Sequence, residues 1–189
     1  MLLAGCLAGY LAPSGAHALK IEGHVYDDTA LVAEESLRLN GAGVRSQLWF
    51  KAFTVALYLP QPSTQASSVL AQPGSKRLRL RMLIEVPAQE FSKALQRGVE
   101  KNHSPAERAP MADRLSQLAQ AVQGLGTLHN GDTVDLDFQP GLGLVLSLNG
   151  QRRGEPVPGD DVYRALLRIF IGERPVQAAL KNALLGGRP

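Results

Sequence analysis

Residues 39–60, LNGAGVRSQLWFKAFTVALYLP, join two glycines, an arginine and a long apolar run. The run is rich in aromatic and β-branched residues, which favours a long strand or a hairpin over 47–59, ended by Pro60. Arg45 stands between the glycines and this run. Because an unpaired buried charge is costly, a guanidinium at the head of a buried strand must meet an anion or several hydrogen-bond acceptors. The sequence therefore makes Arg45 a candidate anion-binding group.

The composition predicts one folded domain of ordinary size. The chain has 189 residues, of which 44% are hydrophobic and 20% are charged, so it can bury a core and is not disordered. Its formal net charge of +3 is far from the clustered basic surface that nucleic-acid binding requires. Arg77, Arg79 and Arg81 alternate with apolar residues, and we interpret them as the solvated face of a strand rather than a polyanion site.

The N-terminal segment has the features of an export signal. The first eighteen residues hold no Lys, Arg, Asp or Glu, and Ala16-His17-Ala18 supplies an A-x-A cleavage pattern after an apolar run. We therefore predict a signal peptide over 1–18, a mature domain over 19–189, and a periplasmic or secreted location. Leu3-Ala4-Gly5-Cys6 resembles a bacterial lipobox, which would put a lipid anchor on Cys6, but the apolar run continues past it. Cys6 is the only cysteine, so the mature domain would hold no disulfide, and no later segment approaches the length of a membrane span.

Apolar periodicity predicts an α+β order of elements. A strand over 20–26, the long strand or hairpin over 47–59 and a strand over 76–86 are expected in the first half. Helices are expected over 64–71, from 87 to about 103, over 115–125, from about 160 to 171 and from about 175 onward, with a two-stranded hairpin over 134–148. This order predicts an antiparallel sheet with helices packed on one face.

Other patterns that could carry chemistry have simpler interpretations. Gly41-x-Gly43 lacks the third glycine and the following helix of a dinucleotide fingerprint, so we expect a tight turn or a close backbone approach. Asp135 and Asp137 share one face of a strand and are predicted to be exposed polar positions rather than an acid–base pair. Spacing alone leaves Ser/His/Asp catalysis open, although no G-x-S-x-G elbow occurs. His24, His103 and His129 do not stand at metal-ligand spacing from another His, Cys or carboxylate. We therefore assign no metal, and we assign no catalytic residue or cofactor.

Several segments together resemble the chalcone isomerase superfamily, most closely its bacterial exported chalcone isomerase-like branch. They are GAGVR (41–45), ALYL (56–59), FIGERPV (170–176) and LKNALLG (180–186), and their order covers nearly all of the chain from Leu19 onward. The resemblance implies an open-faced β-sandwich, in which a large antiparallel sheet has helices layered on one face. A ligand cleft is expected between the sheet and the helices.

The resemblance also implies a set of site residues. Plant chalcone isomerases close a flavanone ring by intramolecular addition of a phenolate; their arginine binds the phenolate or the developing enolate, and Arg45 matches it. The threonine that helps polarise the ketone falls at Phe53 and the tyrosine at Phe91. The asparagine falls at Gly98, and the last Ser/Thr falls near Ile169. Four polar positions are thus apolar or empty while the cation stays, so the resemblance predicts these five residues as the ligand-binding set.

Three functions are compatible with this pattern, and we favour the first. It is a non-catalytic protein that binds a fatty-acid-like or small amphiphilic acid in an apolar cleft through Arg45, as superfamily members that resemble fatty-acid-binding proteins do. The second is an intramolecular lyase or isomerase acting on a chalcone-like or other enone, for which Thr54, Tyr58 or Lys51 would have to reach the cleft. The third is a structural or interaction module without a ligand, in which Arg45 caps backbone carbonyls or pairs with an internal acid such as Glu34 or Glu35.

Overall fold

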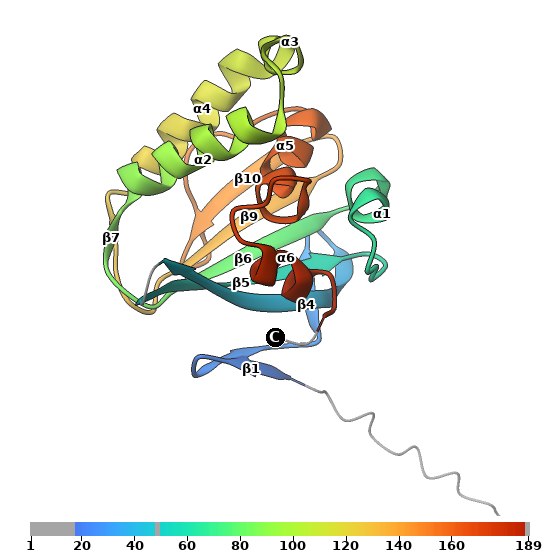
Figure 1. The fold of residues 1–189 in the computed structure, drawn as a ribbon, viewed down its shortest axis with the longest axis vertical. Helices are drawn as coiled ribbons and strands as arrows, with labels where there is room; N and C mark the ends of the chain where they lie inside the picture. Colours follow the sequence, from blue (N-terminus) through green and yellow to red (C-terminus); the bar gives the residue numbers. More distant parts are fainter. Residues whose placement is uncertain (1–17, 48–49, 188–189) are drawn as a thin grey trace, which may run out of the picture.

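The computed structural model describes residues 18–47 and 50–187, and its centre is a curled seven-stranded sheet (Figure 1). The strand order is β11-β10-β9-β6-β5-β4-β3, and neighbouring strands are antiparallel. The strands are β3 (Thr29–Val32), β4 (Glu35–Gln47), β5 (Phe50–Leu59), β6 (Lys76–Met82), β9 (Thr133–Gln139), β10 (Gly143–Leu148) and β11 (Gln151–Arg152). The predicted signal peptide up to His17, with the alternative anchor Cys6, lies outside the described residues.

The helices pack on one face of this sheet (Figure 1). They are α1 (Ala66–Ala71), α2 (Ala88–Asn102), α3 (Pro105–Arg108), α4 (Ala112–Gln123), α5 (Asp160–Ile171) and α6 (Ala178–Leu184), with a 3-10 turn over Ala109–Met111. Two small hairpins are added, β1 (Leu19–Ile21) with β2 (His24–Tyr26), and β7 (Val86–Pro87) with β8 (Thr127–Leu128). This arrangement confirms the predicted α+β open-faced β-sandwich. Among the described residues, no helix is both long and apolar enough to cross a membrane.

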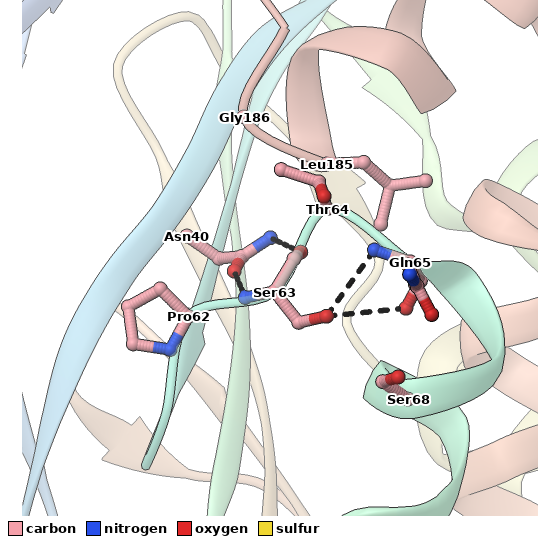
Figure 2. A pocket seen from close by; sticks show the side chains of 8 residues that line it. All are labelled: Asn40, Pro62, Ser63, Thr64, Gln65, Ser68, Leu185 and Gly186. Carbon is pink, nitrogen blue, oxygen red and sulfur yellow. Dashed lines mark hydrogen bonds between the residues drawn. The ribbon is translucent and has the colours of Figure 1, made fainter.

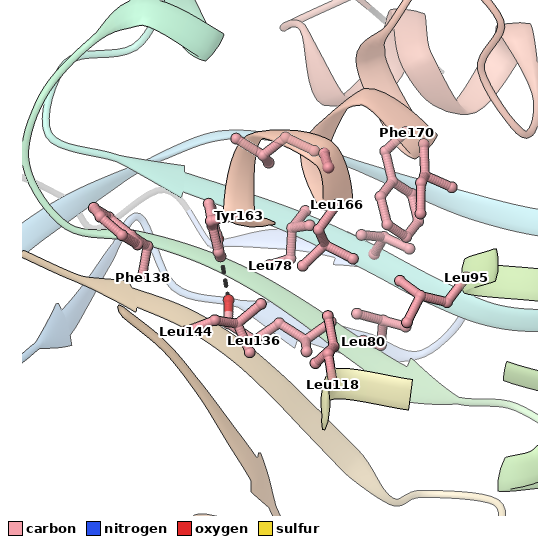
Figure 3. Close-up of a cluster of buried hydrophobic side chains, with 14 of the residues drawn as sticks. Leu78, Leu80, Leu95, Leu118, Leu136, Phe138, Leu144, Tyr163, Leu166 and Phe170 are labelled. Atoms are coloured by element: carbon pink, nitrogen blue, oxygen red, sulfur yellow. Dashed lines mark hydrogen bonds between the residues drawn. The ribbon is translucent and has the colours of Figure 1, made fainter. Parts of the chain in front are cut away.

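The main core lies between the sheet and the helices. Alternate side chains of β6 point into it, and Leu78, Leu80 and Met82 are at most 3% exposed. Leu166 and Phe170 lie four residues apart on α5, so they share the helix face that packs against the sheet. Figure 3 shows leucines from β6, β9, α2, α4 and α5 meeting in this layer.

The opposite face of the sheet corrects two predictions. Arg77 and Arg79, expected to be solvated, lie directly opposite Asp137 and Asp135, which were expected to be exposed. Arg77 Nε and Nη2 donate to Asp137 at 2.7 and 2.6 Å, and Arg79 Nε and Nη2 donate to Asp135 at 2.7 and 2.9 Å. The two aspartate side chains are only 8% and 6% exposed. The bidentate hydrogen bond to Asp135 raises the pKa of Arg79.

The β1–β2 hairpin covers this polar face, which explains why these predictions were wrong. Tyr26 is 1% exposed, and its hydroxyl lies 2.5 Å from that of Thr54. The guanidinium of Arg81 lies over the Tyr26 ring at 5.3 Å, so Arg81 is half-buried rather than solvated. The single strand predicted over 20–26 is in fact this hairpin, because the chain reverses at Glu22 and Gly23, which both have positive φ.

Other boundaries differ from the predictions by a few residues. The hairpin over 47–59 is confirmed in part: β5 is its second strand, but β4 begins at Glu35, so Arg45 lies near the end of the preceding strand. The strand predicted to reach residue 86 ends at Met82. The helices α4 and α6 begin at Ala112 and Ala178 rather than near 115 and 175. Helix α3 was missed, although Ser104 and Glu107 form a capping box at its start.

The two glycines beside Arg45 allow helix α6 to pack on the backbone of β4. A Cβ on Gly41 would lie 2.1 Å from the carbonyl oxygen of Ala183, and one on Gly43 would lie 2.8 Å from the Ala183 Cβ. Side chains at these positions would therefore push α6 away from the sheet. The expected close backbone approach is confirmed, whereas the tight turn is not, since both glycines lie inside the strand.

Candidate ligand-binding site

A cavity of about 540 Å³ lies between α2 and the helix-facing side of the sheet. This volume falls in the range of roughly 300–1,000 Å³ that is usual for small-molecule sites. Figure 3 shows part of its apolar wall, contributed by Leu80, Leu95, Leu118, Leu136, Leu166 and Phe170. The five residues predicted from the resemblance, Arg45, Phe53, Phe91, Gly98 and Ile169, all line this cavity. The structure thus brings the whole predicted set together.

Arg45 enters the cavity from β4 and is held by neutral groups. It lies opposite Phe53 in the β4–β5 pairing, just before an irregularity in the register. Its Nη1 donates to Gln177 Oε1 at 3.3 Å and to the backbone oxygen of Ser46, while Ser46 N donates to the same Gln177 oxygen at 3.1 Å. Partial burial lowers the pKa of Arg45, but an arginine side chain keeps its proton at neutral pH.

No carboxylate compensates this charge within the described ranges. Glu35, considered as an internal partner, instead accepts a hydrogen bond from Ser75 N at 2.8 Å. Glu34 is exposed and forms no ion pair with Arg45. Gln177, the actual partner, lies 132 residues away in the chain and was missed by sequence reasoning, since no local pattern marks it.

The other four predicted residues form an apolar wall. The rings of Phe53 and Phe91 contact each other across the cavity, with centroids 5.2 Å apart and planes tilted by 42°. Gly98 is not an empty position, because Ile169 fills the adjacent space. A Cβ on Gly98 would lie 2.7 Å from Ile169 Cγ2 and 2.9 Å from Cγ1. Helices α2 and α5 therefore meet closely here, where the resemblance places an asparagine and a Ser/Thr.

This fold and cavity agree with the family comparison. The sequence matches the family described as chalcone isomerase-like over residues 18–186. The chain belongs to the chalcone isomerase-like family. A search of curated proteins gave no match.

A solved structure supports the same fold. The crystal structure of a fatty-acid binding protein from Arabidopsis thaliana is similar to this chalcone isomerase-like protein, with a TM-score of 0.68 and 14% sequence identity. The similarity covers 89% of this chain and 95% of that chain. At this level of identity the likeness shows the arrangement of the sheet and helices.

The cavity lining of this chalcone isomerase-like protein consists of apolar and charged residues. The described residues that line it include no hydroxyl, amide or imidazole side chain. Thr54 and Tyr58 lie on the opposite face of the sheet, where Thr54 contacts Tyr26. Tyr58 belongs there to a smaller apolar cluster that also includes Val32 and Leu37. Lys51 binds Glu22 of the β1–β2 hairpin at 2.8 Å and does not line the cavity. None of the three residues proposed for an isomerase reaches the cleft.

A second pocket, polar and about 580 Å³ in volume, lies beside the start of α1 (Figure 2). Asn40 occupies its wall: its Nδ2 donates to the backbone oxygens of Leu184 at 2.6 Å and Ser63 at 3.1 Å, and its Oδ1 accepts from Ser63 N at 2.6 Å. The lining holds no charged side chain in the part of the chain described. We interpret Asn40 as a structural tie between β4, the segment before α1 and the end of α6.

Proposed function

We propose that this chalcone isomerase-like protein binds a fatty-acid-like or small amphiphilic acid without transforming it. The observation that carries the proposal is the Arg45 guanidinium, which lines an apolar cavity and has no acidic partner among the described residues. A ligand carboxylate would supply the missing anion. The planar guanidinium and the planar carboxylate can form two parallel hydrogen bonds with each other. The alkyl chain would lie along the apolar wall, where each buried methylene contributes about 0.8 kcal/mol.

The lining favours binding over catalysis. Polarising a ketone requires hydrogen-bond donors fixed in a dry site, and Phe53, Phe91 and Ile169 offer none. The carboxylates on the lining, Glu85 and Glu90, are exposed. The similar Arabidopsis thaliana protein is a fatty-acid binding protein, which supports the same class of ligand here.

We also propose that the protein acts in the periplasm or after secretion, on the basis of the export pattern over 1–18. Terminal sequencing of the protein recovered from its native compartment tests this part. A mature chain that begins at Leu19 supports it. An uncleaved cytoplasmic chain would contradict export, and a lipid on Cys6 would show lipoprotein processing instead.

Ligand extraction followed by mass spectrometry tests the binding function. Wild-type protein should retain an acidic amphiphile, and Arg45→Ala should bind the same acid about 10- to 150-fold more weakly, because a hydrogen bond to a charged group contributes about 1.5–3 kcal/mol. Arg38→Ala, an exposed arginine at the other end of β4, is the matched control and should bind normally. If neither wild type nor variant binds any acidic lipid or aromatic acid, the carrier function is wrong. Turnover of a chalcone that disappears in Arg45→Ala would establish the isomerase instead.

A further inference from the structure

One end of the cavity mouth carries cations that form no ion pair with any residue the structure describes. Arg97 and Lys101 lie one turn apart on α2, are exposed and line the cavity. Arg174 lies beside them, because Asn102 Nδ2 donates to the Arg174 oxygen at 3.0 Å and Asn102 Oδ1 accepts from Arg174 N at 3.2 Å. Within residues 18–47 and 50–187, none of these three cationic side chains forms an ion pair. With the half-buried Arg45 they place four positive charges on the lining.

The acidic residues of the lining lie toward the other end of α2. Glu90 is in its first turn and is held by Lys93 at 2.8 Å. Glu85 precedes β7 and lies 3.7 Å from His129. Arg97 lies seven positions after Glu90, which is about 10 Å along a helix. The mouth is therefore divided, with its cationic end formed by the second half of α2 and the segment before α6.

Exposed apolar side chains also line the cavity, and one of them, Val176, lies two residues after Arg174. Phe50 is 40% exposed and Val176 is 37% exposed, and both line the cavity. Across the described residues, the large hydrophobic side chains that are exposed are Val25, Leu31, Phe50, Leu142 and Val176. Two of these five thus line the same cavity. Exposed apolar groups next to cations form the combination that binds the interface of an anionic bilayer.

We infer that the cationic end of the mouth docks on an anionic lipid membrane. Phe50 and Val176 enter the interfacial region, while Arg97, Lys101 and Arg174 lie against lipid phosphates. In this orientation the cavity opens toward the bilayer, so an acyl chain passes between bilayer and cavity wall without crossing water. The docking rests on the proposed function in one respect, namely that the cargo is an amphiphile. An acidic protein partner would pair with the cations, but it would not explain the exposed apolar residues that continue into the cavity.

Co-sedimentation with vesicles tests the docking surface. Wild-type protein should bind vesicles of equimolar phosphatidylcholine and phosphatidylglycerol, and binding should fall at high salt and be absent from vesicles of phosphatidylcholine alone. Each cation near an anionic membrane contributes roughly fivefold in affinity, so Arg97→Gln with Lys101→Gln should weaken binding about 25-fold. The control pair Lys20→Gln with Arg38→Gln removes the same charge from exposed positions elsewhere and should bind like wild type.

A second pair of variants tests the apolar contribution. Phe50→Ser with Val176→Ser should weaken binding to the anionic vesicles severalfold, whereas Leu31→Ser with Leu142→Ser should not. No binding by wild type, equal losses in variants and controls, or full binding by the Phe50 and Val176 variant would each overturn the inference. Binding of a soluble fatty acid without vesicles is measured separately. A protein that binds the acid but no vesicles refutes the docking alone, and one that binds vesicles but no acid refutes the cargo alone.

Discussion

Replacing Gln177 by Glu would give Arg45 an internal counterion with almost no change in shape. The amide oxygen of Gln177 already accepts from Arg45 Nη1 at 3.3 Å and from Ser46 N at 3.1 Å. A carboxylate oxygen can occupy the same place and keep both hydrogen bonds. The ligand carboxylate would then have to compete with a permanent anion for the same guanidinium. We therefore expect Gln177→Glu to weaken the binding of acidic amphiphiles specifically.

The expected size of this effect follows from the kind of hydrogen bond that changes. The hydrogen bond from Arg45 to Gln177 already has a charged donor, and a carboxylate would make its acceptor charged as well. Hydrogen bonds to charged groups contribute about 1.5–3 kcal/mol, so a change from the weak to the strong end of this range stabilises Arg45 by up to about 1.5 kcal/mol more than Gln177 does. That difference corresponds to a loss of up to roughly 12-fold in affinity for an acid. The ligand-free protein should gain stability, with about 2–4 °C in Tm for each kcal/mol in a domain of this size.

Calorimetric titration with a fatty acid and with the alcohol of the same chain length measures this effect. The alcohol carries no charge, so its affinity should be the same for wild type and Gln177→Glu. Gln151→Glu on β11, at the far edge of the sheet, adds the same charge at an exposed position and serves as the control. Unchanged affinity for the acid, or equal losses for acid and alcohol, would refute the assignment of Arg45 as the carboxylate-binding group.

Three further changes probe the packing between α2 and α5 and the buried polar groups on the opposite face of the sheet. Gly98→Ala puts a Cβ 2.7 Å from Ile169 Cγ2 and should lower the free energy of unfolding, measured in urea, by about 1–3 kcal/mol. In the double variant with Ile169→Ala, the loss should be smaller than the sum of the two single losses, because the smaller side chain makes room for the new Cβ. Asp135→Asn leaves the largely buried Arg79 without its anion and should lower the free energy of unfolding by about 3 kcal/mol. Burial raises the pKa of Tyr58 to about 12 from 10.0, because the folded protein favours the neutral hydroxyl. The contribution of this neutral hydroxyl to the free energy of unfolding is therefore complete below pH 10 and is lost as the pH rises through 12. Tyr58→Phe should therefore lose less stability over that interval than wild type does, by up to about 2–3 kcal/mol in denaturant titrations.

Each of these changes has an outcome that contradicts its reasoning. Full additivity of Gly98→Ala and Ile169→Ala would show that the two positions do not share space. Asp161→Asn, which breaks the more exposed bidentate pair with Arg114, should cost no more than about 1 kcal/mol. Equal losses for Asp161→Asn and Asp135→Asn would show that burial of the inner pair has no energetic weight. Parallel curves for wild type and Tyr58→Phe above pH 10 would show that the Tyr58 hydroxyl ionises normally.

The fold could be predicted because its elements are encoded locally. Alternation along β6 and β9 and the apolar stripes of α2 and α5 each require only a dozen neighbouring residues to recognise. The groups that cover the polar face of the sheet come from distant parts of the chain, so no local pattern predicts them. Arg79 and Asp135 lie 56 residues apart and become partners only through the β6–β9 register, and the hairpin above them comes from the N-terminal end. The same alternation of apolar and charged residues occurs in a strand whose polar face contacts water and in one whose polar face is covered by a hairpin, so the sequence does not distinguish the two.

The same distinction explains what could be predicted about the site. Arg45 was identified because a cation beside an apolar strand conflicts with local expectation, and such conflicts mark functional positions. Gln177 gives no such signal, because a half-buried glutamine before a helix is ordinary. Its hydrogen bond to Arg45 depends on Gly41 and Gly43, which let α6 approach β4. Because its oxygen is neutral, it orients the guanidinium without cancelling the charge. A carboxylate at residue 177 would accept from the same backbone N–H but would also neutralise the guanidinium. Under the proposed function, the amide of Gln177 is therefore what leaves the charge of Arg45 available to a ligand.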